Sequence, residues 1–313
     1  MRQPGAEVPA RLSGGQSGRP SAGQRAYAER TVRTLGRRRA VNAVMVGLTY
    51  AAAALATLPL LFILVYLIQR GASSISLDLF TEMPAPVGAE GGGMANAIVG
   101  TLMLIGIACA VGLPVGMGAG IYIAENRGTR LANVVRFLSD VLNGLPSIVM
   151  GIFAWQLLVR PVGHFSALAG GIALGAMMIP IVTRTTEEMI RTVPVSLREA
   201  AFALGYPRWR TSLTIVLRTA LAGIVTGALV AIARIAGETA PLLFTAFGNQ
   251  FWSVELDQPI AALPLQIYTY AISPYDEWHA LAWAGSLVLI ALVLLISVAA
   301  RFFTRARYGG GGD

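Results

Sequence analysis

Two charged residues interrupt the apolar stretch of residues 219–244, and their types and spacing could bind an oxyanion. Arg234 and Glu238 are the only charged residues in that stretch. A spacing of four places both on one face of a helix, and a guanidinium presents a planar fork of donors that matches the oxygens of an anion. We predict that Arg234 binds the anion, that Glu238 orients Arg234 or accepts from an anion hydroxyl, and that Thr239 lines the same face.

The predicted setting of this pair is near the middle of a membrane-spanning helix. A charge at the centre of a span costs about 2.5–3.5 kcal/mol on insertion scales, so the pair must face protein or water. We favour a role on a polar path, because charged side chains inside a span are functional by default. The alternative is an internal ion pair that fixes helix packing or a subunit interface.

A proline and a serine in a second apolar stretch could open the backbone to the same path. Pro146 and Ser147 lie within residues 141–159, which carry no charge. Broken membrane helices are tolerated where the freed backbone faces protein or a wet cavity. We predict that Pro146 and Ser147 break the span and line the path. A simple proline kink is the alternative, since proline is common in such helices.

Six apolar stretches provide the elements that must position these residues. The chain of 313 residues is 55% hydrophobic and only 13% charged, which is about half the charged share of soluble domains. About 20 apolar residues cross a bilayer as a helix, and lipid cannot satisfy a free backbone group. We therefore predict an all-α polytopic membrane protein with six transmembrane helices. These spans are expected at residues 41–68, 91–124, 141–159, 161–183, 219–244 and 280–300.

The distribution of arginine predicts the orientation of the spans. All 24 basic residues are arginine; nine precede the first span, three separate spans two and three, six separate spans four and five, and three follow span six. The opposite loops hold two arginines and seven acidic residues. The positive-inside rule then places both termini in the cytoplasm. We interpret the net charge of +8 as topology and attraction to anionic membrane lipid, not as nucleic-acid binding.

Composition divides the chain into three regions. Residues 1–40 are basic and, before about residue 25, rich in Gly, Pro, Ser and Gln, so we predict a disordered cytoplasmic tail. Residues 41–307 form the predicted transmembrane domain, and residues 308–313 form a C-terminal tail. The first apolar run exceeds the 7–15 residues of a signal-peptide core, so we predict that it is retained.

Motifs typical of enzymes are absent from the sequence. Without lysine there can be no GxxxxGK[ST] phosphate loop, and neither HExxH nor GxSxG occurs. Two distant histidines do not make a usual zinc site. Residues 12–16 read LSGGQ, a signature of ABC-type ATPases, but they lie in the tail without a nucleotide domain, and we treat the match as chance. We predict no enzyme activity, cofactor or metal in this chain.

A short helix is predicted between spans four and five, within a cytoplasmic loop of about residues 186–217. Ser196 and Glu199 have the spacing of a capping box, which would satisfy free N–H groups at the helix start. Gly205 suits the left-handed residue after a helix end, and Pro207 prevents continuation. The result would be a rigid helix exposed to the cytoplasm.

The same loop resembles the EAA motif of ABC importer permeases. The matching residues keep the motif's spacing: Glu199, Ala200, Ala201, Gly205, Ile215 and Leu217. Arg218 replaces the proline that ends the family pattern. In that family the loop is a coupling helix that seats in a cytoplasmic ATPase subunit, with Ala200, Ala201 and Leu204 as a small apolar surface. The alternative is a capped connector without a partner.

Two further segments resemble the permeases of phosphate importers. Residues 233–242 read ARIAGETAPL and residues 145–153 read LPSIVMGIF; the first is more similar to the PstA-type than to the PstC-type subunit. The resemblance covers nearly the whole chain beyond the tail. It implies a type I ABC importer permease fold in the cell membrane, which moves inorganic phosphate into the cytoplasm. It also implies a PstC-type permease partner, two separate ATPase subunits and an external phosphate-binding protein.

Two alternatives remain open from the sequence. The cargo could be another oxyanion, such as sulfate or molybdate. An ATP-independent secondary carrier would also explain a charged pair inside a span, although no inverted repeat is visible. In either importer reading, residues 249–277 are expected to form the outer surface on which a binding protein docks.

Overall fold

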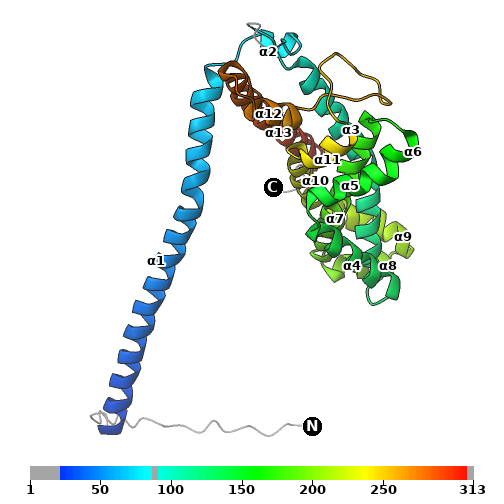
Figure 1. The fold of residues 1–313 in the computed structure, drawn as a ribbon. Coiled ribbons are helices and arrows are strands. Elements are labelled where there is room, and N and C mark those ends of the chain that lie inside the picture. The colour runs from blue at the N-terminus through cyan, green and yellow to red at the C-terminus, as the bar shows by residue number, and fades with distance from the viewer. Residues whose placement is uncertain (1–21, 87–90, 309–313) are drawn as a thin grey trace. The chain divides into compact units, whose positions relative to one another are not determined.

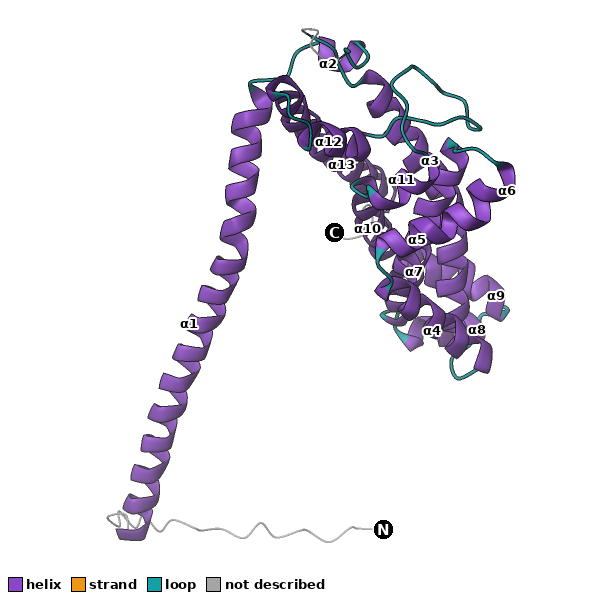
Figure 2. Cartoon of the chain, in the orientation of Figure 1, coloured by secondary structure: helices purple, strands orange, loops and turns teal. Residues whose placement is uncertain are grey.

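The computed structural model describes residues 22–86 and 91–308, with side chains for residues 37–86 and 91–302. These residues fold almost entirely into helices, and the one extended contact among them is an isolated parallel bridge between Phe247 and Ile260. Figures 1 and 2 show the helices. Their bounds are α1 (Ala22–Ala72), α2 (Asp78–Thr81), α3 (Ala95–Glu125), α4 (Arg130–Gly144), α5 (Ser147–Ala154), η1 (Trp155–Val159), α6 (Arg160–Val162), α7 (Ala167–Arg191), α8 (Val195–Ala203), α9 (Arg208–Arg210), η2 (Thr211–Val216), α10 (Leu217–Ala236), α11 (Ala240–Thr245), α12 (Leu263–Ala271) and α13 (Asp276–Tyr308).

The chain divides into two units, residues 1–64 and residues 65–313, which are described separately. The first unit contributes most of α1, whose side chains from residue 41 to residue 64 are exposed in the isolated chain although most are apolar. Such a surface suits lipid or a neighbouring membrane protein. Helix α1 begins at Ala22, inside the region expected to be a tail; residues 1–21 and 309–313 of the two expected tails lie outside the described residues.

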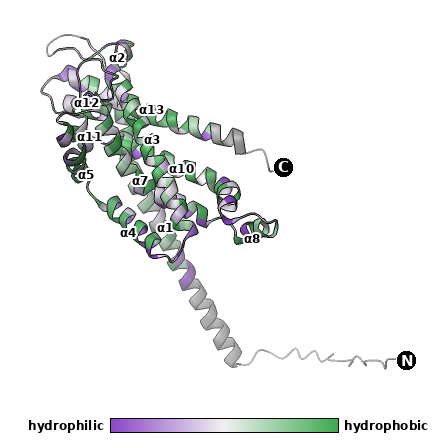
Figure 3. Cartoon of the chain, turned by 90° about the vertical axis from the view of Figure 1, so that its right-hand side faces the viewer, coloured by the Kyte–Doolittle hydropathy of each residue, from purple (hydrophilic) through white to green (hydrophobic). Residues whose placement is uncertain are grey.

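The described residues contain six candidate membrane crossings when one bent pair is counted as a single span. Five helices are long and apolar enough to cross alone: Arg37–Ala72, Ala95–Glu125, Ala167–Arg191, Arg208–Ala236 and Asp276–Phe302. The third crossing consists of Arg130–Gly144 and Ser147–Val162, which meet at an angle of 107°. The all-α fold with six spans is confirmed in this sense. Figure 3 shows hydrophobic residues running along α3, α10 and α13.

The predicted boundaries of spans four and five were wrong. Span four continues past residue 183 to Arg191, and span five begins at Arg208 and ends at Ala236. The charged residues that marked the ends in the sequence stay helical, because several of them pair on the helix surface instead of requiring a loop. The connection between the two spans is correspondingly shorter, and α8 occupies most of it.

Helices α3 and α7 form the centre of the second unit. Gly112, Gly116 and Gly120 recur every four residues on α3 and meet the backbone of α7 directly. A Cβ on Gly116 would lie 2.8 Å from the Cβ of Val182 and 3.0 Å from the carbonyl oxygen of Ile179. Small residues at this spacing let membrane helices approach closely. The contact fixes α7, against which α5, α10 and α11 of the site described below pack.

Candidate functional site

Span five ends abruptly at the residues predicted to bind an anion. Helix α10 ends at Ala236, Gly237 follows as its C-cap, and Thr239 is the N-cap of α11. Pro241 occupies the first turn of α11, where its missing N–H is tolerated. In a continuous helix Pro241 could not donate to the carbonyl of Gly237, four residues earlier, and its ring would clash with that carbonyl, while Gly237 itself weakens the helix. Together they explain a break that the hydropathy pattern did not predict.

The break changes the predicted geometry of the charged pair. Arg234 lies in the last turn of span five, not near its middle, and Glu238 lies beyond the helix end. Within the described residues, no ion pair or hydrogen bond joins Arg234 to Glu238. The prediction that they share one helix face was therefore wrong, because the helix needed for that spacing ends at Ala236.

The side chain of Arg234 is exposed in the isolated chain, whereas Glu238 and Thr239 are half-buried. Their neighbours Ile235 and Ala236 are buried, at 0% and 2% exposure. The guanidinium thus projects from a well-packed helix end, and within the described residues it has no ion-pair partner. It is available to an anion or to a second subunit.

Span three breaks at Pro146, which confirms the predicted interruption and excludes a simple kink. Leu145 and Pro146 are extended, with ψ of 136° and 138°, and α5 starts at Ser147. The carbonyl of Pro146 accepts from the amides of Val149 and Met150. Pro146 is exposed and Ser147 is half-buried. The break therefore leaves backbone near an accessible surface.

The two short helices that follow the two breaks pack against each other. Gly151 of α5 lies so close to α11 that an added Cβ would be 2.9 Å from the Cα of Pro241 and 3.2 Å from the carbonyl oxygen of Ala240. The α5–α11 contact brings the segment after Pro146 and Ser147 beside the segment after Arg234, Glu238 and Thr239. No hydrogen bond links these predicted site residues across the contact in the part of the chain that the structure describes.

The predicted cytoplasmic helix is α8, and its C-terminal end is confirmed. Gly205 is left-handed with φ of 81°. The amide of Tyr206 donates to the carbonyl of Ala201, and the amide of Gly205 donates to that of Phe202. These two bonds make a Schellman motif. The predicted capping box was wrong: Pro194 is the N-cap and makes no side-chain cap bond, so Ser196 falls inside the first turn.

Helix α8 exposes Ala200 and Leu204 of the predicted apolar surface, but not Ala201. Glu199 and Ala200 are exposed, but Ala201 is buried at 2% exposure because α8 packs against η2. Large apolar side chains are exposed on α8 and just after it: Val195, Leu197, Phe202, Leu204 and Trp209. A contiguous exposed apolar patch commonly marks a protein interaction site.

A buried carboxylate ties α4 to α7 near α8, and the sequence analysis missed it. Glu187 of α7 accepts from Arg136 of α4 at 2.6 Å, from Arg184 at 3.0 Å and, more weakly, from Arg191 at 3.4 Å. Arg184 also donates two hydrogen bonds of 2.8 Å to the carboxylate of Asp140 on α4. The helical spacing of Arg184, Glu187 and Arg191 was a visible signal; the pairing with α4 was not.

A second ion pair attaches α8 to the centre of the unit. Arg198 of α8 donates to Glu125, the last residue of α3, at 2.6 Å. Both side chains are mostly covered, at 19% and 24% exposure. The short linker before α8 holds Val193, which is also buried. Helix α8 is therefore connected to α3 by this ion pair and to α7 by the short linker.

No group of three or more His, Cys, Asp or Glu residues among the described side chains comes together as a metal site would require. The site consists instead of arginine, hydroxyl and backbone groups at two helix breaks, together with α8.

The sequence matches the family described as "Binding-protein-dependent transport system inner membrane component" over residues 116–307. It is 50% identical over 265 residues to the phosphate transport system permease protein PstA of Yersinia pestis, covering 84% of this chain and 90% of that protein. It is 38% identical to a probable PstA protein of Methanocaldococcus jannaschii, covering 79% and 88%.

Solved structures show the same fold at low sequence identity. A bacterial ABC transporter that imports the acidic polysaccharide alginate matches with a TM-score of 0.58 and 14% identity, covering 88% of this chain and 99% of that chain. The MetNI methionine ABC transporter in an inward-facing conformation matches with a TM-score of 0.56 and 20% identity, covering 68% and 96%.

The family match and the relatives at 50% and 49% identity identify the chain as an inner-membrane permease of an ABC importer, and the solved structures share its fold. The chain belongs to the family of binding-protein-dependent transport system inner membrane components and, within it, to the PstA-type permeases.

Proposed function

We propose that this chain lines one half of a path for inorganic phosphate, with Arg234 as the anion-binding side chain. The observation that carries the proposal is the exposed guanidinium at a break in span five, in a chain about half identical to phosphate transport permeases. Arginine suits phosphate because its fork of N–H donors matches two oxygens at once. Glu238 and Thr239, at the same break, would accept from and donate to the partly protonated anion.

The second break supports the same path. Pro146 and Ser147 begin a short helix that packs on α11, so both interruptions contribute to one region. In a single chain Arg234 remains exposed, and the facing wall would come from a second permease of the PstC type. This partner buries Arg234 and reduces its contact with bulk water, which strengthens its attraction for an anion.

Helix α8 is proposed to couple this path to two separate ATPase subunits. The ATPases would contact its exposed face, including Glu199 and Ala200, while the buried Ala201 and the turn at Gly205 keep the helix rigid. Force would pass from α8 to α7 through the short linker. Arg136 and Arg184 connect α7 to α4, which ends at the break before Pro146. Phosphate would arrive on an external binding protein.

Uptake of labelled phosphate tests the path. In cells lacking the native permease, the chain should restore uptake, and excess sulfate or molybdate should compete poorly. Arg234→Gln should reduce uptake by roughly 100-fold, the scale of a lost charge-assisted contact. Arg160→Gln, an exposed arginine of α6, is the matched control and should transport normally. Normal uptake by Arg234→Gln at normal membrane level would remove Arg234 from the path.

The coupling role has its own test at Gly205. A β-branched residue cannot adopt the left-handed backbone without strain, so Gly205→Val should abolish uptake while the chain still inserts. Gly128→Val is the control, because Gly128 is also left-handed but lies in another loop. If the Gly205 variant still stimulates ATP hydrolysis and transports phosphate, α8 is not the coupling element.

A further inference from the structure

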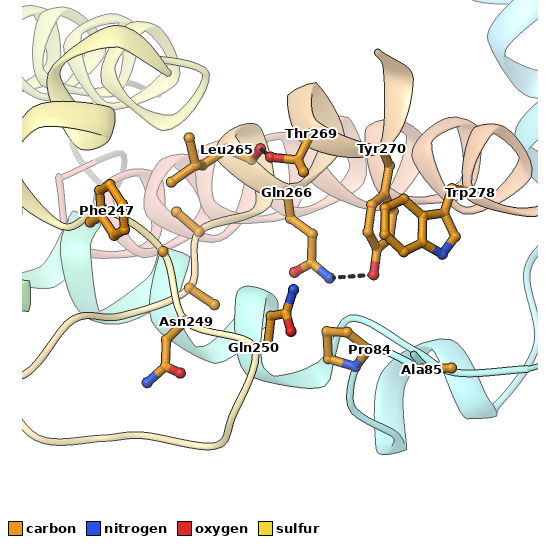
Figure 4. A pocket seen from close by; sticks show the side chains of 13 residues that line it. Pro84, Ala85, Phe247, Asn249, Gln250, Leu265, Gln266, Thr269, Tyr270 and Trp278 are labelled. Carbon is orange, nitrogen blue, oxygen red and sulfur yellow. Dashed lines mark hydrogen bonds between the residues drawn. The ribbon is translucent and has the colours of Figure 1, made fainter. Parts of the chain in front are cut away.

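A cavity of about 300 Å³ lies at the end of the second unit that is opposite α8. Figure 4 shows its walls: the loop at Pro84 and Ala85, the loop around Gln250, helix α12 and the start of α13. Because α8 joins spans four and five, the connections before span two and after span five fall on the other side of the membrane. If α8 is cytoplasmic, this cavity faces outward.

Two further hollows are linked to the cavity through shared lining residues. Trp278 lines both the cavity and a hollow of about 320 Å³ formed by residues 274–278. Glu277 lines that hollow and a third of about 330 Å³, which also contains Asp78. We call these three together the outer hollow. It carries three carboxylates, Asp78, Asp276 and Glu277, and no basic side chain lines it among the described residues.

The floor of the cavity is aromatic and rigid. Tyr270 is buried at 5% exposure and stacks on Trp278 with a centroid distance of 4.7 Å. Asn249 fixes the loop opposite through two hydrogen bonds. Its side-chain amide donates to the carbonyl of Pro259, and its backbone carbonyl accepts from the side-chain amide of Asn96. The shape of the cavity is therefore set before anything binds, which lowers the entropy cost of binding.

Hydrogen-bonding groups remain available inside this rigid shape. Gln266 donates to the phenol oxygen of Tyr270 at 3.1 Å, so the proton of Tyr270 is left for another acceptor. Burial raises the pKa of Tyr270, which keeps that proton in place at neutral pH. The side-chain amide oxygen of Gln266 and the exposed side chain of Gln250 face the same space. One donor beside amide acceptors matches the N–H and C=O groups of a peptide.

The charge of the rim decides between possible occupants. Carboxylates at Asp78, Asp276 and Glu277 repel phosphate and the anionic headgroups of lipids. They attract a lysine or arginine, whose alkyl stem can pack on the Tyr270–Trp278 pair. The imidazole of His279 lies beside Asp276, with 3.8 Å between its Nδ1 and the carboxylate oxygen, which is too long for a hydrogen bond. A basic peptide segment fits both the floor and the rim.

We propose that the outer hollow receives a basic loop of the external phosphate-binding protein. The loop's backbone would bond to Tyr270 and Gln266, and its cationic side chain would lie against Glu277 and Asp276. This proposal rests on the proposed function, and it names the contact through which the binding protein reaches this subunit.

Binding of the purified, phosphate-loaded binding protein to the whole importer in lipid nanodiscs tests the proposal. The double variant Asp276→Arg with Glu277→Arg should weaken binding roughly tenfold or more and reduce its dependence on salt. Gln250→Trp, which fills the cavity mouth without changing charge, should also weaken binding. Asp257→Arg, combined with Glu255→Arg, is the matched control: it makes the same charge change elsewhere in residues 249–277 but lines none of the three hollows, and its affinity should stay near wild type.

Copurification of all subunits establishes that each variant assembles. Equal affinity of the Asp276 and Glu277 double variant and of the Glu255 and Asp257 control would overturn the proposal, as would normal binding by Gln250→Trp. In either of these cases wild-type phosphate uptake stands, so the proposed function survives. If the wild-type complex binds the binding protein but moves no phosphate, the proposed function fails, and the proposed contact, which rests on it, fails as well. Reduced uptake with unchanged binding-protein affinity would assign the hollow to a lipid and contradict the proposal.

Discussion

The arginines around Glu187 and the arginine at position 234 occupy opposite environments in one chain. Glu187 is almost fully buried and is contacted by three guanidinium groups, one of which also grips Asp140. Arg234 is exposed at a helix end, and the described residues offer it no carboxylate partner. In the first arrangement, the guanidinium groups donate hydrogen bonds to carboxylates of the same chain. In the second arrangement, the donors of Arg234 remain available to an anion or to another subunit.

Pairing within the chain distinguishes a structural charge from a functional one more reliably than the position of the charge in a span does. Both sets of charges lie within candidate membrane helices, where each charge is costly. The cluster at Glu187 offsets that cost by internal pairing, so its effect should appear in stability. Arg234 has no such compensation in the isolated chain, so its effect should appear in transport. Substitutions that compare the two sites can confirm or break this contrast.

Removal of the central carboxylate should have the largest effect on stability. Glu187→Gln leaves three guanidinium groups around a neutral amide, and breaking a buried ion pair by removing one partner costs roughly 3–5 kcal/mol. Thermal unfolding of the purified complex in detergent should show a clear fall in melting temperature. Glu188→Gln, the exposed acid one position further on, is the control and should melt like wild type.

Loss of the arginine that bridges two acids should have an intermediate effect. Arg184→Gln removes both bonds to Asp140, but Glu187 keeps Arg136 at 2.6 Å. We expect a loss of about 1.5–3 kcal/mol, the range for hydrogen bonds to charged groups. The same melting assay checks it, and a drop as large as that of Glu187→Gln would mean that Arg136 alone cannot hold the carboxylate.

The smallest effects on stability should come from Arg191 and Arg234. The Arg191 side chain is 51% exposed and its bond to Glu187 is long, at 3.4 Å, so Arg191→Gln should change stability by at most about 0.5 kcal/mol. Arg234→Gln should also melt within this margin, while losing uptake. A destabilised Arg234→Gln complex would place Arg234 in a structural pair with the partner permease and erase the contrast with Glu187.

Most of the fold followed from the sequence because lipid restricts the possible structures. Apolar runs of sufficient length must be helical, so six spans could be counted, and Gly205 and Pro146 correctly predicted a helix end and a break. Boundaries failed where charged residues stay helical, as Arg184 and Arg191 do beside Glu187. The capping box failed because α8 begins earlier, at Val195 after Pro194.

The candidate site was less predictable, since it depends on contacts between distant segments. Arg136 and Glu187 are 51 residues apart, and nothing in either local sequence specifies that they meet. Ala201 looked like part of a docking surface because the sequence does not reveal that η2 covers it. Arg234 and Glu238 were assigned to one helix face, whereas Gly237 and Pro241 divide that helix in two.

Chemical restoration of charge at position 234 tests the central claim most directly. In a Cys109→Ser background, Arg234→Cys should assemble but take up little phosphate. Reaction with a methanethiosulfonate that adds an aminoethyl group should restore part of the uptake, because it returns a cation to the path. A reagent that adds only a neutral methylthio group should restore none. Normal uptake by the unreacted cysteine variant, or equal rescue by the neutral reagent, would contradict a role for Arg234 in binding phosphate.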